Sequence, residues 1–329
     1  MRPQTLPPNV LRHFYAGGER IAAFRGLQDP RDHTPEEWLG AVNTTFGATD
    51  GRGLSRTADG TLVRDAIAAD PEAWLGPDHV ARFGTDPALL TKLLDAGERL
   101  PVHFHPGRAF AREHLGLGHG KTEAWIILEA EPGATVHVGF TEDVEPHTVR
   151  RWLDTQTSRA MLGALHELPV ASGDTIFVPA GTPHAIGAGI FMVELQEPTD
   201  LSILLEWRGF AALSEQDAHL GLGWDVALRA LDRRGWSEAE AQGLKKAHYG
   251  LVPEARAYFR VEHVRGGDRL DAGYSLLVGL AGEGELGGEP VRRGSVVLVP
   301  HAAGELTLTG DAQALRCRPP DPSAPEGEW

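Results

Sequence analysis

Four side chains in three short segments have the types and spacing of a metal site. His103 and His105 alternate just before Pro106, Glu123 follows in the segment GKTEAW, and His184 closes the segment PAGTPH. Three imidazoles and one carboxylate are donors that zinc, iron and manganese all accept. The sequence therefore predicts a divalent metal site with His103, His105, Glu123 and His184 as its ligands.

A lysine beside this donor set adds a second kind of chemistry. Lys121 stands two residues before Glu123, in a chain whose basic residues are nearly all arginine. A partly buried lysine can exchange protons, whereas arginine stays protonated. We expect Lys121 to bind substrate or transfer a proton. Glu194, within the apolar segment FMVELQ, is a second candidate for catalysis, with a salt bridge or a rim carboxylate as the alternative.

Strands and turns must position these groups. Side chains alternate along a strand, so His103 and His105 share one face, as do Lys121, Glu123 and the largely packing residue Trp125. The segment DTIFVP leads into a turn rich in proline and glycine that presents His184. A closed antiparallel sheet with these faces inward would bring the ligands together. His114 and His119 are expected to be solvent-facing loop histidines.

The rest of the chain predicts a mainly β protein with helical segments. We expect an N-terminal catalytic unit over 1–210 with a helical segment near 61–96, where Asp86 and Pro87 read as helix-start signals before an apolar leucine stripe. A second helix is predicted over 145–165. A helical connection over 211–248 then leads to a C-terminal β unit over 249–329 that ends in a mobile, proline-rich tail.

A faint internal repeat connects the two β units. The segment GDTIFVP at 173–179 aligns with GSVVLVP at 294–300, and the same register puts Glu305 where the first copy has His184. Two copies of one β unit are therefore predicted, with the metal site present in the first only. The alternative to a repeat is that both segments simply share the glycine and proline pattern common in turns beside strands.

Composition limits the partners. The net charge of −15 without long basic runs argues against nucleic acid and anionic membranes, but it allows a small anionic substrate. The single cysteine, Cys317, excludes an intrachain disulfide and fits a reducing compartment. The first residues lack the apolar core of a signal peptide, so we expect a cytoplasmic protein. The sequence does not indicate the oligomeric state.

The motifs resemble those of the cupin fold, and more narrowly those of type I mannose-6-phosphate isomerases. In that family the strings are similar to L-S-V-Q-x-H-P, G-K-T-E-x-W and G-D-x-x-F-V-P-A-G-T-x-H-A-I-G. The corresponding segments here are LPVHFHP, GKTEAW and GDTIFVPAGTPHAIG. The likeness is specific over about 89–200 and looser outside that range.

The resemblance implies a double-stranded β-helix barrel with a degenerate second cupin-like unit. It also implies a zinc-dependent aldose–ketose isomerase that interconverts mannose 6-phosphate and fructose 6-phosphate through a cis-enediol. Such a reaction requires a group that stabilises the developing oxyanion, and a metal with an open coordination position can do this. It also requires a side chain with a suitable pKa that transfers the proton.

Two departures from the family pattern bear on metal and substrate. His103 stands where the family usually has glutamine, and three histidines with one glutamate also suit Fe2+, Mn2+ or Ni2+. After the last motif, Leu204 occupies the place of a family arginine, while Arg208 directly follows Trp207. Arginine is the natural clamp for phosphate, so we take Arg208 as a candidate that enters the pocket, with a surface arginine as the alternative.

Other functions stay open at this point. An isomerase of an unphosphorylated or different sugar, a cupin Fe(II) oxygenase that uses the same four ligands, and a non-catalytic sugar-binding cupin would share these motifs. Lys121 and the helical segments on both sides favour the isomerase. A sugar or sugar phosphate is the expected partner in the favoured function.

Overall fold

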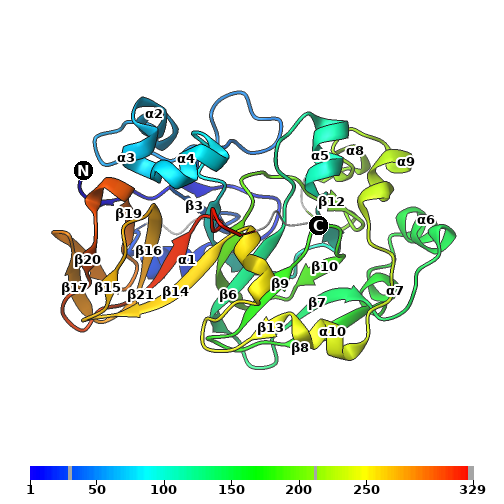
Figure 1. Ribbon diagram of the computed structural model, residues 1–329. Coiled ribbons are helices and arrows are strands. Elements are labelled where there is room, and N and C mark those ends of the chain that lie inside the picture. Colours follow the sequence, from blue (N-terminus) through cyan, green and yellow to red (C-terminus); the bar gives the residue numbers. More distant parts are fainter. Residues whose placement is uncertain (29–31, 211–212, 325–329) are drawn as a thin grey trace.

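Antiparallel strands dominate the computed structural model, which describes residues 1–28, 32–210 and 213–324. Figure 1 shows two β units side by side, the green and cyan one in the centre and the orange and red one at the left. Helices cover the top and the right of the first unit. The mainly β architecture with helical segments is as predicted.

The first unit is built on a seven-stranded sheet in the order β13-β9-β6-β11-β4-β3-β2. Its strands are β2 (Val10–Leu11), β3 (Glu36–Leu39), β4 (Leu90–Ala96), β6 (Glu123–Ala130), β9 (Thr175–Val178), β11 (Ile190–Gln196) and β13 (Lys245–Lys246). β6, β9, β4 and β11 are almost wholly buried along their length, so their sequences do not alternate regularly between apolar and polar residues.

A five-stranded sheet in the order β12-β5-β10-β7-β8 faces this sheet. Its strands are β5 (His103–Phe104), β7 (Thr135–Phe140), β8 (Leu165–Pro169), β10 (His184–Ile186) and β12 (Ile203–Leu204). Side chains from both sheets meet in one apolar core that includes Trp125, Ile127, Val136, Ile186 and Met192. This core closes the space between the sheets and leaves polar side chains at one end.

The prediction of a helix at the end of the segment 61–96 is wrong. Three short helices, α2 (Val63–Ala69), α3 (Pro71–Leu75) and α4 (Pro77–Phe83), are present, but residues 90–96 form strand β4. β4 pairs with β11 and β3, and every one of its residues is buried. A strand covered on both faces shows no alternation, so its leucines resembled a helical stripe.

The other helices are shorter than the sequence suggested. The predicted helix over 145–165 is split into α6 (Pro146–Thr155) and α7 (Ser158–Leu162), because Gln156 between them is left-handed at φ 52°. The remaining helical elements are α1 (Glu19–Arg25), α5 (Arg108–Leu115), α8 (Glu215–Ala218), α9 (Trp224–Ala227), η1 (Leu228–Ala230), α10 (Glu238–Gly243), η2 (Pro253–Ala257) and η3 (His301–Ala303). None of the helices in the described ranges has the length and apolar content to cross a bilayer.

The second unit is a five-stranded sheet in the order β1-β19-β16-β21-β14, with two small two-stranded sheets, β15-β20 and the hairpin β17-β18. Its strands are β1 (Gln4–Thr5), β14 (Arg260–Arg265), β15 (Arg269–Leu270), β16 (Ser275–Ala281), β17 (Glu283–Leu286), β18 (Glu289–Arg292), β19 (Val296–Val299), β20 (Leu306–Thr307) and β21 (Gln313–Arg318). One face packs on the first unit through Leu276, Leu298 and Cys317, and the other encloses a smaller core.

Two pairings cross the division that the sequence suggested. β1, from the first residues, pairs with β19 of the second unit, and β13, from the helical connection, pairs with β9 of the first. The division at 210 and 248 stays a prediction. Part of the predicted mobile tail, residues 325–329, lies outside the described residues.

Candidate functional site

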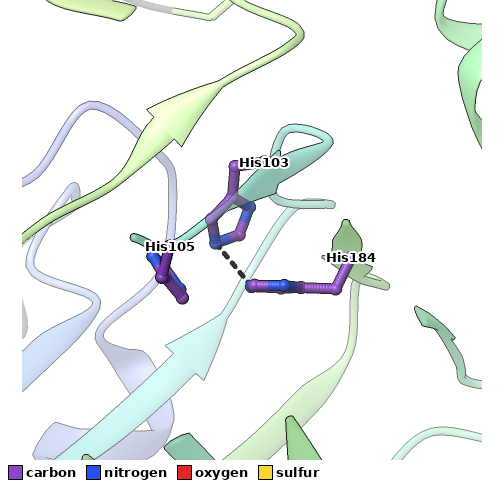
Figure 2. Close-up of side chains that lie close together, drawn as sticks. All are labelled: His103, His105 and His184. Atoms are coloured by element: carbon purple, nitrogen blue, oxygen red, sulfur yellow. Dashed lines mark hydrogen bonds between the residues drawn. The ribbon is translucent and has the colours of Figure 1, made fainter. Parts of the chain in front are cut away.

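The two sheets of the first unit together form a barrel, called the first barrel below. Three histidines meet at its polar end. His103 on β5 and His184 on β10 are direct partners in the antiparallel register, and His105 follows one residue after β5 ends. Figure 2 shows the three imidazoles pointing toward one another. Their ligand nitrogens lie within 4.8 Å of one another, and all three residues are buried. The structure thus brings together three of the residues that the sequence predicted as metal ligands.

Backbone carbonyls fix how each ring presents itself. The Nδ1 atoms of His103, His105 and His184 lie 2.8, 2.7 and 2.8 Å from the carbonyl oxygens of Pro101, Leu201 and Thr182. A carbonyl only accepts, so each Nδ1 carries the proton and each Nε2 keeps its lone pair. All three lone pairs consequently point into the same small space.

Glu123 supplies the carboxylate of the set. It is the first residue of β6 and is 1% exposed. Its Oε2 lies 3.1 Å from His105 Nε2, and its Oε1 lies 3.3 Å from His184 Nε2 and accepts from Trp125 Nε1 at 3.0 Å. The indole therefore orients the carboxylate toward the histidines.

These distances fit a bound divalent cation. Ligand atoms about 2.0–2.2 Å from a tetrahedral zinc lie roughly 3.3 Å apart. His103 Nε2 and His184 Nε2 are 2.9 Å apart, and the buried Glu123 Oε2 has no aligned hydrogen-bond donor among the described residues. Two lone pairs and an unsatisfied carboxylate oxygen face each other, which a shared cation would stabilise.

The environment holds the donors in the states that a metal requires. Burial lowers the pKa of His103 well below its usual value, and burial together with the Lys121 ammonium lowers the pKa of His105 to about 3. Burial would raise the pKa of Glu123, but Lys121 and His105 outweigh it and hold that pKa well below its usual value. Neutral imidazoles and an ionised carboxylate are the ligand forms.

A row of buried charges of alternating sign runs away from the ligands. Lys121 Nζ lies 3.1 Å from Glu123 Oε2 and 3.9 Å from Glu194 Oε1. Lys92 Nζ lies 3.5 Å from Glu194 Oε2 and 3.2 Å from Glu36 Oε2. The predicted candidates Lys121 and Glu194 thus belong to one network with the ligands. Within it, each buried charge has a neighbour of opposite sign, as burial demands.

Lys92 and Glu36 anchor the far end of this row. Burial alone would lower the pKa of Lys92, but the carboxylates of Glu36 and Glu194 outweigh it and raise it. Glu36 accepts from Tyr15 Oη at 2.7 Å and from Trp38 Nε1 at 2.7 Å. Burial, opposed by Lys92 and reinforced by the charge of Glu123, raises the pKa of Glu194 to about 8, so this carboxyl group can both accept and release a proton near neutral pH.

The network lines a cavity that opens outward. The inner cavity measures about 50 Å³ and is lined by the two lysines, the glutamates of the row, His13, Asp200 and Leu204. It shares His13, Phe14, Asp200, Ser202 and Leu204 with an outer cleft of about 1080 Å³, which also includes Arg12, His33 and Arg52. A small molecule with one polar end and one anionic end would fit this shape.

Arg208 lies elsewhere. Its side chain is exposed, its backbone N–H donates to Gln156 Oε1 at 3.1 Å, and it lines neither the inner cavity nor the outer cleft. Leu204, in the place of the family arginine, is 5% exposed and lines both. We therefore leave Arg208 out of the mechanism.

Sequence reasoning missed several polar residues of the site. Lys92 fell in the segment wrongly predicted as a helix, although its rarity as a lysine in this chain was a usable signal. His119 is only 20% exposed at its side chain and contacts Asp86 Oδ2 at 2.8 Å and Glu197 Oε1 at 3.7 Å, so the solvent-facing prediction for it is wrong. Long-range pairing of this kind leaves no local pattern.

Comparison with known proteins bears on what the site does. No protein-family model matches the chain. A mannose-6-phosphate isomerase of Bacillus subtilis is 30% identical over 313 residues, which cover 91% of this chain and 93% of that protein. A mannose-6-phosphate isomerase of Streptococcus mutans is 33% identical over 194 residues, which cover 56% of this chain and 54% of that protein.

Solved structures agree in fold over nearly the whole chain. The crystal structure of the Bacillus subtilis mannose 6-phosphate isomerase superposes with a TM-score of 0.75 at 22% identity, covering 97% of this chain and all (100%) of that one. A mannose 6-phosphate isomerase bound with zinc and yttrium gives a TM-score of 0.69 at 14% identity, covering 98% and 100%. The 30% identity to the Bacillus subtilis mannose-6-phosphate isomerase compared by sequence extends over almost the full length of both chains, so this chain belongs to the mannose-6-phosphate isomerase family.

Proposed function

We propose that the chain is a metal-dependent aldose–ketose isomerase that interconverts mannose 6-phosphate and fructose 6-phosphate. The observation that carries the proposal is the cluster of three inward Nε2 atoms and Glu123, of which His103 and Glu123 line a cavity together with Lys121, Lys92 and Glu194. The names of the relatives support the same activity.

Zinc is the proposed metal, held by His103, His105, Glu123 and His184. When bound, it would act as a Lewis acid that stabilises negative charge on the sugar oxygens. Three neutral imidazoles and a carboxylate suit zinc, and a zinc-bound isomerase with the same fold supports the choice. A reducing cytoplasm, the proposed location, suits the free and buried Cys317.

The chain's own residues would move the proton between C1 and C2 of the open-chain sugar. Lys121 Nζ, 3.2 Å from His105 Nε2, is placed to donate a hydrogen bond to a sugar oxygen held beside the ligands. Glu194, 2% exposed, is placed to take the proton from one carbon and return it to the neighbouring carbon. Lys92 holds the Glu194 carboxylate in place from the other side.

The phosphate group requires a cationic contact that the family arginine does not supply here. Leu204 makes that part of the inner wall apolar, so we propose that the phosphate extends into the outer cleft toward Arg12 and Arg52. The Arg52 guanidinium donates to the carbonyl oxygen of Arg12, which keeps the two residues together at the cleft. Arginine forks match phosphate oxygens well.

A coupled assay of the zinc-loaded protein tests the proposal. We expect turnover of mannose 6-phosphate by the wild type and a loss of at least a hundredfold in kcat for Lys121→Ala and for Glu194→Gln, since proton transfer by a positioned group contributes about 10²–10⁴-fold. Lys246→Ala, which removes an exposed lysine on β13, is the matched control.

Unphosphorylated mannose and fructose are run beside the sugar phosphates. Turnover confined to the free sugars would assign an isomerase of unphosphorylated sugar instead. No turnover of any aldose or ketose with zinc, iron, manganese or nickel would overturn the isomerase assignment.

A further inference from the structure

The sheets of the second unit form the second barrel, which repeats the strand order of the first. β19, β16 and β21 are neighbours in that order, as β9, β6 and β11 are. The sequence repeat aligns Val178 of β9 with Val299 of β19. Glu123 pairs with Val178, and Ser275 pairs with Val299. Ser275 is therefore the counterpart of the metal-site glutamate.

The same register assigns counterparts to the other polar positions. Glu194 pairs with Trp125, two residues after Glu123, and Arg316 pairs with Leu277, two residues after Ser275. Arg316 thus takes the place of Glu194. Two residues further along, Arg318 takes the place of Gln196, so the acidic end of the first barrel has become an arginine-rich end in the second.

A cavity of about 210 Å³ lies at this arginine-rich end. Arg260 of β14, Arg318 of β21, Tyr274 just before β16, and His301 of η3 line it from the second barrel. His79 of α4 and the exposed Asp78 line it from the first unit. It shares no lining residue with the inner cavity of the metal site.

Cations exceed anions among the strand and loop residues around this cavity. Arg316 and Arg318 share the carboxylates of Asp271 and Glu262. Arg260 has no carboxylate within 4.0 Å among the residues that the structure describes, and its Nε donates to the Pro319 carbonyl at 3.0 Å. Among the described residues that line the cavity, two arginines, Arg260 and Arg318, therefore outnumber one carboxylate, the exposed Asp78.

The excess charge is also poorly solvated. Arg318 is 7% exposed, and its buried Nε has no hydrogen-bond acceptor in the described part of the chain. Burial, and then repulsion by Arg318, lowers the pKa of Arg260 to about 10. In the described part of the chain Arg260 thus lacks a carboxylate partner and Arg318 has one buried N–H without an acceptor, and an anion placed between the two guanidinium groups would accept from both.

We propose that this cavity binds a small tetrahedral oxyanion, such as phosphate or the phosphoryl group of a small metabolite, between Arg260 and Arg318. The volume holds several waters at about 30 Å³ each but is below the roughly 300 Å³ at which drug-sized ligand sites begin. Donors approach from β14, β21 and η3, and so from several directions. That arrangement suits a tetrahedral acceptor better than a planar carboxylate, which one guanidinium fork can satisfy.

Calorimetric titration with inorganic phosphate at fixed ionic strength tests the site. The doubly substituted protein with His184→Ala and Arg52→Ala is used as the background, so that phosphate binding at the metal site and at the outer cleft is removed. We expect one phosphate per chain in this background, binding at least tenfold weaker after Arg260→Ala. Arg265→Ala, at the exposed far end of the same strand, is the matched control and should bind as before.

Two further arms keep the test decisive if Arg260→Ala does not fold. Ala272→Glu places a carboxylate in the cavity and should abolish phosphate binding, because Ala272 lines it. Sulfate should replace phosphate, whereas formate should not. An absence of phosphate binding in the doubly substituted background, or equal weakening by Arg265→Ala, would overturn the site. Formate binding as tightly as phosphate would overturn the tetrahedral assignment.

Discussion

The two barrels use one strand order to hold opposite kinds of chemistry. In the first, Glu123 and Glu194 stand on neighbouring strands, with the lysines Lys92 and Lys121 between carboxylates and three histidines at the mouth. In the second, the corresponding strands carry Ser275 and Arg316, which contact each other at 3.3 Å.

This difference shows that a few residues of the fold determine what each barrel can bind. Apolar residues such as Val178 and Val299 occupy equivalent places in both barrels and keep the sheets closed. At the strand ends the polar side chains differ: Arg316 takes the place of Glu194, and Ser275 takes the place of Glu123. We infer that function in this architecture depends on a few strand-end side chains, and the following substitutions separate those side chains from the frame.

The largest effect is expected from removing one metal ligand. His184→Ala should lose zinc and lower kcat at least a thousandfold, since three remaining donors no longer close the site. Metal content of the purified protein by mass spectrometry and the coupled assay measure this. His147→Ala, an exposed histidine on α6, should keep both. Full zinc occupancy in His184→Ala would contradict the assigned ligand set.

Breaking the buried charge row should cost much stability, and more than breaking its counterpart. Lys92→Met leaves Glu36 and Glu194 buried without their cation, which typically costs about 3–5 kcal/mol. Arg316→Met leaves Glu262 and Asp271, whose side chains are 39% and 65% exposed and can be solvated by water. We expect about 1–2 kcal/mol there. Denaturant unfolding compares the two, and equal losses would contradict the argument from burial.

His119 should make the stability of the first unit depend on pH. Burial would lower its pKa, but Asp86 and Glu197 outweigh burial and raise it to about 9. A raised folded-state pKa stabilises fully below the unfolded value of about 6.5, and this stabilisation is lost as the pH rises through 9. His119→Gln should therefore be less stable by about 2 kcal/mol at pH 6, with the difference shrinking by pH 10. A difference independent of pH would show that the charge does not contribute.

The smallest effect is expected at the outer cleft. Arg52→Ala should raise KM for mannose 6-phosphate by about tenfold, which corresponds to one exposed charge-assisted contact of about 1.4 kcal/mol, and leave kcat nearly unchanged. Steady-state kinetics at two salt concentrations measure this, with Arg56→Ala, outside this cleft, as the control. An unchanged KM would place the phosphate elsewhere.

The sequence indicated the four candidate metal donors that the structure brings together, but not the row of charges behind them. His103, His105, Glu123 and His184 lie in compact motifs whose strand parity and turns are local properties. Lys92 reaches the site only because β4 pairs with β11, a contact between distant parts of the chain, and its fully buried strand looked helical. Arg208 was misjudged as a pocket candidate because spacing alone does not tell which way a strand end turns.

The most direct measurement is a titration of metal-free protein with zinc while isomerase activity on mannose 6-phosphate is followed. The first barrel has one set of four donors, and the corresponding end of the second barrel has arginine instead. We therefore expect activity to rise in proportion to added zinc and to stop rising at one equivalent per chain. Full activity in the metal-free protein, or none at any zinc concentration, would contradict a single metal centre that supports isomerisation.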